Sequence, residues 1–292
     1  MRVLITGARG QLGQSLRERV PEDWEVIFTD SKTLDITNSK TVDAMVQGFQ
    51  PQIIVNTAAY TNVDQAEHEQ GLAFAVNARG VANLAQAAQK VGSRLIHIST
   101  DYVFSGNTDQ PYVYTDAPNP SNVYGKSKLA GEMLALSLCD ATTVVRTSWV
   151  FSEHGRNFVP AVINKLLDLQ TVEVYENNVG TPTYAGALAN HIIELITHND
   201  TPKMLHYCGD VVMSRAELAQ LIADTLSLST AHTYHIDVTA SGKPVHSEHC
   251  VRPPYSALLS THAATNGIAH SKTALQQHIQ FIIQSLLSKQ ST

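Results

Sequence analysis

The side chains best suited to proton transfer in this sequence are Tyr124 and Lys128, which stand four residues apart. On a helix, positions i and i+4 lie on one face, so the phenol and the ammonium group would point the same way. The pKa of a free phenol is about 10, and a nearby ammonium lowers it because it favours the phenolate. A hydroxyl from Ser99 or Thr100 could hold a substrate oxygen against this phenol. Such a site would protonate a carbonyl oxygen while hydride arrives at its carbon.

This spacing is common, and an ordinary amphipathic helix with solvated lysines would also contain it. It indicates a reductase only if the same chain binds a nicotinamide coenzyme. The N-terminus supplies that second feature, because an apolar run at residues 2–6 predicts a buried strand and G-A-R-G-Q-L-G follows at residues 7–13. We expect Gly7 to turn the chain, Gly10 to admit a pyrophosphate and Gly13 to let the helix pack on the strand. The free N–H groups of that helix would face the phosphates.

The second predicted strand, at residues 25–29, ends at Asp30. A carboxylate at this point usually binds the adenosine ribose and disfavours a 2′-phosphate. Lys32 would have the opposite effect, so the sequence leaves the choice between NADH and NADPH open. Asp35 or Thr37 is a candidate N-cap for the next helix, a role that is compatible with coenzyme contact.

The composition argues against several classes of protein. The chain has 292 residues, of which 43% are apolar and 16% charged, and its formal net charge is −6. This length fits one large domain or two unequal ones. No basic run predicts a nucleic-acid surface, and no apolar run reaches the roughly 18 residues of a membrane span. Three widely spaced cysteines and a start without a signal peptide predict a cytoplasmic enzyme with reduced thiols.

Predicted strands and helices alternate along the first 200 residues, which is typical of a doubly wound parallel sheet of the Rossmann type. Ligands bind such sheets beyond the carboxyl ends of the strands. Five segments fall at that edge, namely Gly7, Asp30 and residues 56–59, 99–100 and 146–148. We predict a dinucleotide-binding domain over residues 1–150, to which parts of 170–200 return. A smaller, mainly substrate-binding domain would follow over residues 151–292.

Six segments together resemble the dTDP-4-dehydrorhamnose reductases, a family of extended short-chain dehydrogenases/reductases. They are residues 7–13, N-T-A-A-Y-T-N-V-D-Q-A-E at 56–67, S-T-D-Y-V-F-S-G at 99–106, Y-G-K-S-K-L-A-G-E at 124–132, R-T-S-W-V-F at 146–151 and G-T-P-T at 180–183. The resemblance is dense over residues 1–190 and loose afterwards. The Y-x-x-x-K motif identifies only the superfamily, whereas the segments at 58–67 and 99–104 are far more specific.

The resemblance implies roles for individual residues. Thr100, Tyr124 and Lys128 would form the catalytic triad: Tyr124 would donate the proton, Lys128 would lower its pKa and hold the nicotinamide ribose, and Thr100 would orient the C4 oxygen. Besides Tyr124 and Lys128, the implied coenzyme contacts are Gly7, Gly10, Gln11, Leu12, Gly13, Asp30, Asp35, Ile36, Ala58, Ala59 and Tyr60. The implied substrate contacts are Val63, Thr100, Asp101, Tyr102, Trp149 and Arg252.

Three of the implied substrate contacts could instead have an ordinary structural role. Asp101 could cap a turn, as aspartates commonly do, and Trp149 could be ordinary core. Arg252 is the candidate for the substrate's diphosphate, with Lys243 in reserve, and it could also be a solvated loop arginine. Asn77 resembles the helix asparagine that shapes the active site in this superfamily.

The implied activity is NAD(P)H-dependent reduction of the C4 ketone of dTDP-4-dehydro-L-rhamnose to dTDP-L-rhamnose. The alternatives are a related dTDP-sugar 4-ketoreductase with another product, and a non-catalytic subunit like the partner of methionine adenosyltransferase. The intact Thr100, Tyr124 and Lys128 argue against the second.

No metal site is predicted from the sequence. Family members that dimerise around Mg²⁺ have a glutamate just after the glycine loop, where this chain has Gln14 and Ser15, with Glu18 a turn later. This departure argues against a metal-bridged dimer, and we expect a monomer or a homodimer. Two histidine pairs, at residues 232 and 235 and at 246 and 249, lie in polar sequence without a third ligand at a suitable spacing.

Overall fold

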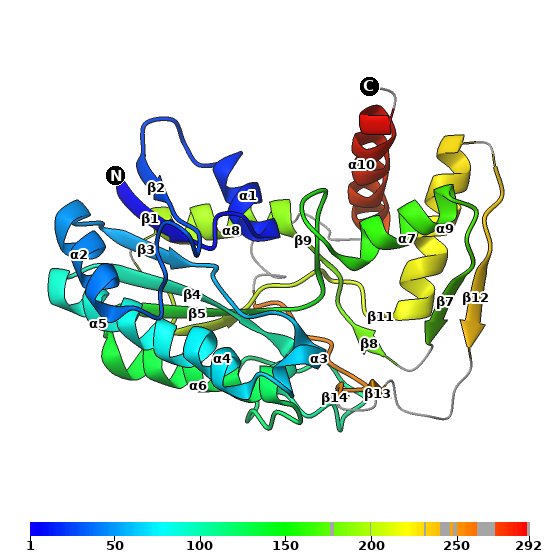
Figure 1. Cartoon of the computed structure of the whole chain (residues 1–292). Helices are drawn as coiled ribbons and strands as arrows, with labels where there is room; N and C mark the ends of the chain where they lie inside the picture. The colour runs from blue at the N-terminus through cyan, green and yellow to red at the C-terminus, as the bar shows by residue number, and fades with distance from the viewer. Residues whose placement is uncertain are drawn as a thin grey trace.

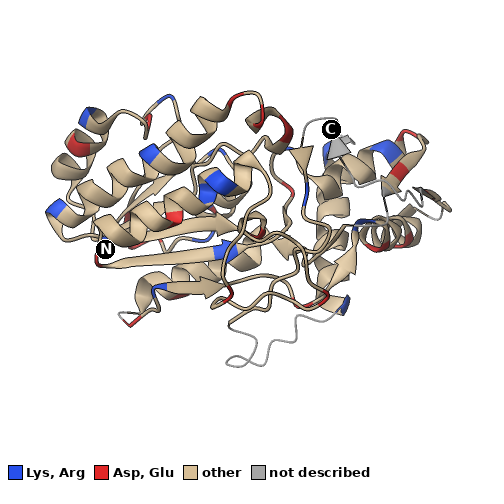
Figure 2. Cartoon of the chain, turned by 90° about the horizontal axis from the view of Figure 1, so that it is seen from below, with Lys and Arg blue, Asp and Glu red and all other residues tan. Residues whose placement is uncertain are grey.

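The structure is a computed structural model that describes residues 1–175, 178–198, 200–230, 232–239, 246–247, 250–261 and 272–290. Lys243 and His249, both candidates above, lie outside the described residues. Within the described part of the chain, the search for helices that could cross a bilayer finds none. Figure 2 shows acidic and basic residues interspersed over the described elements.

Six apolar strands form one parallel sheet, in the order β10-β5-β4-β3-β1-β2. They are β1 (Arg2–Thr6), β2 (Glu25–Phe28), β3 (Ile53–Asn56), β4 (Arg94–Thr100), β5 (Thr142–Thr147) and β10 (Met204–His206). Every residue of β3 and β5 is buried, as expected for parallel strands covered on both faces. The strand order reverses between β1 and β3, where such folds bind their ligands. The predicted Rossmann fold is confirmed.

Helices cover both faces of this sheet (Figure 1). On one face, α1 (Gln11–Arg17) and α8 (Ala185–Thr197) pack against Val3 and Ile5 of β1. On the other face, α2 (Ser39–Phe49), α5 (Val81–Val91) and α6 (Val123–Leu138) surround Leu4. Successive side chains of β1 therefore enter opposite cores, which is the alternation that a strand imposes.

The connection after β3 is broken into short pieces. It comprises α3 (Val63–Ala66), α4 (Gln70–Phe74) and a π-helix (Ala75–Gly80) that runs into α5. The π-helical segment therefore separates α4 from α5. After β4, a 3₁₀ turn (Asp101–Val103) carries the chain away from the sheet edge.

A second, smaller unit lies beside the sheet and has its own core (Figure 1). It contains α7 (Phe158–Leu167), α9 (Arg215–Thr230) and α10 (Lys272–Gln290), together with the parallel pair β7 (Val172–Tyr175) and β12 (Ile236–Thr239). Two-residue strands form three further pairs: β6 (Val150–Phe151) with β9 (Thr183–Tyr184), β8 (Val179–Gly180) with β11 (Met213–Ser214), and β13 (His246–Ser247) with β14 (Cys250–Val251).

Two boundaries differ from the sequence prediction. The returning segment extends past residue 200, because β10 joins the large sheet beside β5. Three residues are too short to show a strand periodicity, so this strand left no signal. The sequence pattern weakens after about residue 200 and is typical of a loop at residues 237–251, yet the described residues there include the end of β12 and the β13-β14 pair.

Candidate active site

The glycine loop between β1 and α1 is shaped by close approach of the backbone. Gly7 has φ +71°, and a Cβ there would lie 2.6 Å from the Ala58 nitrogen. A Cβ on Gly13 would lie 2.5 Å from the Gly7 carbonyl oxygen. Gly10 differs, because it is exposed and its Cβ would approach only the Gly7 oxygen, at 3.2 Å. Packing of the chain therefore explains Gly7 and Gly13, whereas Gly10 leaves free the space that a pyrophosphate needs to reach the backbone.

A cavity of about 410 Å³ opens beside this loop, at the carboxyl ends of the strands. It gathers nine of the predicted residues, namely Gly10, Gln11, Leu12, Ala59, Thr100, Asp101, Tyr124, Lys128 and Trp149. Arg9, Thr57, Thr61, Ile98, Ser99, Thr147, Val150, Gly155 and Arg156 complete the lining. This lining includes both the glycine loop and the start of α6, so a dinucleotide bound at the loop could reach the Tyr124 phenol.

Helix α6 brings Tyr124 and Lys128 to the cavity in its first turns. The Asn122 side chain caps the helix by accepting a hydrogen bond from the Gly125 N–H at 2.8 Å. The pKa of Tyr124 is raised by burial, whereas its hydrogen bond with Thr100 opposes that rise. The sequence predicted that Lys128 lowers this pKa, but the net shift is upward, because burial of the phenol is the largest contribution. The Lys128 ammonium donates to the Ile98 carbonyl at 2.6 Å.

Lys128 and its surroundings form a buried polar layer under the cavity. Burial lowers the pKa of Lys128 to about 8, and Glu132 opposes that shift. The Glu132 carboxylate accepts hydrogen bonds from Ser99 and, at 2.7 Å, from Nη2 of Arg146. The hydroxyl of Ser99 is thus committed to this layer, whereas the hydroxyl of Thr100 contacts Tyr124. Between the two hydroxyls that the sequence left open, the structure favours Thr100.

Asp101 is a buried carboxylate that joins three segments of the chain. Its oxygens accept hydrogen bonds from Thr100 at 3.0 Å, from Ser148 at 3.2 Å and from Ser256. Burial raises the pKa of Asp101 to about 6, although these three hydrogen bonds oppose the shift. Since Ser256 belongs to the C-terminal segment, Asp101 connects the end of β4 to that segment.

Asn77 lies in the π-helix and fixes the loop that follows β3. Its side chain accepts from the Tyr60 N–H at 2.8 Å and donates to the Tyr60 carbonyl and to Ser127, both at 3.0 Å. A Cβ on Gly131 would lie 2.1 Å from the Asn77 carbonyl oxygen, so α6 packs directly on the π-helix. π-Helical turns occur often at functional sites, and this one holds α6 in place.

A second cavity, of about 280 Å³, adjoins the first and shares Trp149 with it. Its lining is Tyr102, Trp149, Phe158, Glu173, Val174, Asn178, Arg215, Arg252, Pro253 and Ser256. Arg252 pairs with Asp64 at 2.7 Å, which fixes the C-terminal segment to α3, directly after Val63. Arg215 lies over the Trp149 ring at 3.5 Å from its centroid.

Arg215 was missed by the sequence reasoning. Burial lowers its pKa to about 10, so it stays charged at neutral pH. It is the first residue of α9, directly after Ser214, and Ser214 forms reciprocal hydrogen bonds with Glu217. A cation at a helix N-terminus is opposed by the helix dipole, and that disfavoured placement is the one signal that could have singled out Arg215.

Trp149 separates the cavities, and its backbone is strained. Its φ of +45° lies in the left-handed region, which is uncommon for a bulky residue. A Cβ on Gly180 would lie 2.3 Å from the indole ring, so the ring packs on that glycine. The ring also lines a third cavity of about 260 Å³ with Arg156 and Phe158.

Asp30 lies at the end of β2 with both carboxylate oxygens engaged. One accepts from the N–H groups of Lys32 and Thr33, at 2.9 and 3.0 Å, and the other pairs with Arg9. Desolvation opposes the shift, but these hydrogen bonds and Arg9 lower the pKa of Asp30. The cation beside this carboxylate is therefore Arg9, from the glycine loop, and Lys32 contributes its backbone N–H.

The remaining predicted residues lie outside the lining of the large cavity. Asp35 accepts from the N–H of Thr37 at 2.9 Å, while the N-cap of α2 is Asn38, which corrects the predicted cap. Ile36 is buried against Gly80. The Tyr60 hydroxyl donates to Glu69 at 2.7 Å. Ala58 packs against the core under α2 and α5.

The chain matches known proteins over nearly its whole length. Residues 1–287 match the family described as RmlD substrate binding domain. A dTDP-4-dehydrorhamnose reductase from Aggregatibacter actinomycetemcomitans is 42% identical over 230 residues, which cover 76% of this chain and 78% of that protein. One from Mycobacterium tuberculosis is 34% identical over 283 residues, covering 94% and 91% of the two chains. The crystal structure of dTDP-4-dehydrorhamnose reductase from Bacillus anthracis with NADP has a TM-score of 0.86 at 34% identity, covering 99% of both chains.

Proposed function

Because the chain belongs to the RmlD family of dTDP-4-dehydrorhamnose reductases, we propose that it reduces the C4 ketone of dTDP-4-dehydro-L-rhamnose with NADPH, giving dTDP-L-rhamnose. The observation that carries this proposal is the meeting of Thr100, Tyr124 and Lys128 in a cavity that begins at the glycine loop. The second, arginine-lined cavity adjoins it across Trp149, where a sugar diphosphate would lie.

The glycine loop and its neighbours would hold the coenzyme. Gly10, Gln11 and Leu12 would bind the pyrophosphate, and Ala59 and Lys128, which line the same cavity, would lie nearer the nicotinamide. When it is bound, NADPH supplies the hydride. The pairing of Arg9 with Asp30 supports use of NADPH, because the guanidinium offsets the repulsion between this carboxylate and a 2′-phosphate.

Tyr124 would supply the proton. Its raised pKa keeps the phenol protonated at neutral pH, so it can act as an acid toward the developing alkoxide at C4. Thr100 donates its own proton to Asp101 and accepts from the Tyr102 N–H, which leaves one lone pair to accept from the phenol and orient it. The Lys128 ammonium, four residues away on the same face, would stabilise the phenolate that remains after proton transfer.

The second cavity would hold the rest of the substrate. Arg215 and Arg252 provide two guanidinium groups, and a guanidinium matches phosphate oxygens through paired N–H donors. Tyr102 and Trp149 would flank the keto-sugar at the junction of the two cavities, and Val63 lies next to the Arg252–Asp64 pair.

The test is reduction of purified dTDP-4-dehydro-L-rhamnose. We expect one NADPH oxidised per keto-sugar, and NMR of the product should show the rhamno configuration at C4. A talo configuration would identify a different 4-ketoreductase. Binding of the nucleotide sugar without NADPH oxidation would contradict the proposed reductase activity.

A further inference from the structure

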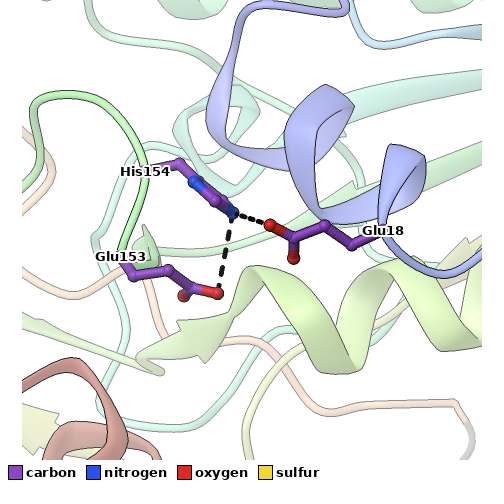
Figure 3. Close-up of side chains that lie close together, drawn as sticks. All are labelled: Glu18, Glu153 and His154. Atoms are coloured by element: carbon purple, nitrogen blue, oxygen red, sulfur yellow. Dashed lines mark ion pairs between the residues drawn. The ribbon is translucent and has the colours of Figure 1, made fainter. Parts of the chain in front are cut away.

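Three potential metal ligands meet beside the end of α1, and none of them belongs to the linings of the cavities described above. Glu18 follows the last turn of α1, while Glu153 and His154 belong to the loop after β6. One ligand atom from each residue lies within 4.8 Å of the other two. Figure 3 shows a carboxylate oxygen of each glutamate turned toward the imidazole.

The imidazole makes ion-pair contacts with both carboxylates, without a well-aligned hydrogen bond to either. The Nε2 atom of His154 lies 2.9 Å from Glu18 Oε1 and 3.6 Å from Glu153 Oε1. Even so, this buried nitrogen makes no hydrogen bond, which means that the nearer oxygen lies off the direction of the ring N–H. Two adjacent ligands of one ion, each bonded at about 2.1 Å, stand about 3 Å apart and point at the ion rather than at each other. The Glu18–His154 contact has this form.

Burial supplies a second reason for a cation here. The Glu153 side chain is 7% exposed, and its Oε2 atom has no hydrogen-bond partner. Its Oε1 atom accepts only from the Tyr184 hydroxyl, at 3.2 Å. A buried carboxylate with so few partners is costly unless a cation compensates it. Arg19 does not fill this role, because it pairs with the other oxygen of Glu18.

We propose that Glu18, Glu153 and His154 bind a divalent first-row transition-metal ion, with Zn²⁺ the preferred occupant. One imidazole and two carboxylates suit Zn²⁺, whereas Mg²⁺ favours oxygen ligands and retains its waters. Arg19 and Tyr184, each bound to a ligand carboxylate, would orient the first ligand shell. The ion would fasten α1 to the loop whose residues Gly155 and Arg156 line the coenzyme cavity.

The first experiment is a titration of full-length, chelator-treated protein with Zn²⁺ by calorimetry. We expect a site of one-to-one stoichiometry, and a Tm higher by about 5 °C at a free Zn²⁺ concentration of 100 times Kd. Titration with Mg²⁺ should give no comparable binding. Co²⁺ should give a visible spectrum that reports nitrogen and oxygen ligands. Each readout is independent of reductase activity.

Matched variants assign the site. Glu18→Gln and His154→Asn should each weaken Zn²⁺ binding by at least about tenfold. The exposed residues Glu22 and His198 provide the controls Glu22→Gln and His198→Asn, which should bind as the wild type does. Glu18 is itself exposed, so its variant is expected to fold. Unchanged affinity in Glu18→Gln and His154→Asn, or no Zn²⁺ binding by the wild type, would overturn the proposal.

Discussion

The two halves of the cleft are built in different ways. On the coenzyme side, the glycine loop and Thr100 sit at the ends of parallel strands of one sheet, so the sheet topology gathers them, and packing on the π-helix places the start of α6 beside them. On the substrate side, Tyr102, Trp149, Arg215 and Arg252 come from four separate segments. The comparison teaches that strand pairing is enough to align groups along the edge of a regular sheet. The second cavity depends instead on packing between side chains that are far apart in the sequence.

The chemistry of the two halves differs as well. The coenzyme side offers backbone N–H groups, the Lys128 ammonium and the side chains of Arg9 and Arg156. The substrate side offers two guanidinium groups, one of them stacked on Trp149. If this division is functional, each single substitution should change mainly one quantity: kcat, the KM for the nucleotide sugar or the KM for the coenzyme.

The most severe test of the division is Tyr124→Phe, which removes the proton donor and keeps the ring. We expect kcat to fall by roughly 10²–10⁴-fold, the usual scale for loss of general acid catalysis. Coenzyme Kd, measured by fluorescence titration, should hardly change. A variant with near-normal kcat would show that Tyr124 is not the proton donor.

Substitution of the two arginines tests the substrate side. Arg252→Ala and Arg215→Ala should each raise the KM for the nucleotide sugar by about one to two powers of ten, because each loses a charged hydrogen bond. Coenzyme KM should stay constant, and the exposed Arg79→Ala serves as the control. Arg252→Lys should lose much less than Arg252→Ala, since it keeps the charge. If either alanine variant keeps the wild-type substrate KM, that arginine does not bind the diphosphate.

The pH dependence of kcat/KM tests whether the reaction needs the charged ammonium group of Lys128. The pKa of Lys128 is lowered to about 8, so the cation is present below this pH and is lost as pH rises through it. Tyr124 stays protonated over the same range, because its pKa is raised. We expect kcat/KM to fall about tenfold per pH unit above pH 8, and Lys128→Arg to lose this alkaline limb. A flat wild-type profile to pH 10 would assign the ammonium a structural role only.

The smallest expected effect concerns coenzyme choice. Arg9→Ala should lower kcat/KM for NADPH relative to NADH by about fivefold, the scale of an exposed ion pair. Asp30→Ala should shift the same ratio in the opposite direction, because it removes repulsion of the 2′-phosphate. The ratio is read from initial rates with the two coenzymes. Should it stay fixed in both variants, neither side chain contacts the adenosine end.

The sequence predicted the coenzyme side far better than the substrate side. Glycine spacing, strand periodicity and the Tyr124–Lys128 interval are local patterns, so they predicted the Rossmann sheet and the position of α6 correctly. The roles of Thr100, Tyr124 and Lys128 stay predictions that the variants above would test. The sequence could not decide between Ser99 and Thr100, because that depends on Glu132, which lies on another element.

Elsewhere, the deciding contacts are too distant in sequence to leave a pattern. The Arg215 guanidinium stacks on the ring of Trp149, a residue that is distant from it in the sequence. The pairing of Arg9 with Asp30 links the glycine loop to the end of the next strand. The raised pKa of Tyr124 reflects burial by the whole cleft. Each of these properties belongs to the folded protein rather than to a motif.

The position of Trp149 gives the protein a built-in optical reporter. The chain has two tryptophans, and Trp24 packs against the core beneath α1 and α8, away from the cleft. Trp149 alone borders both main cavities and lies against Arg215. In a Trp24→Phe background, its emission should respond separately to each ligand. The order in which coenzyme and nucleotide sugar enter the cleft could then be followed in real time, without any attached label.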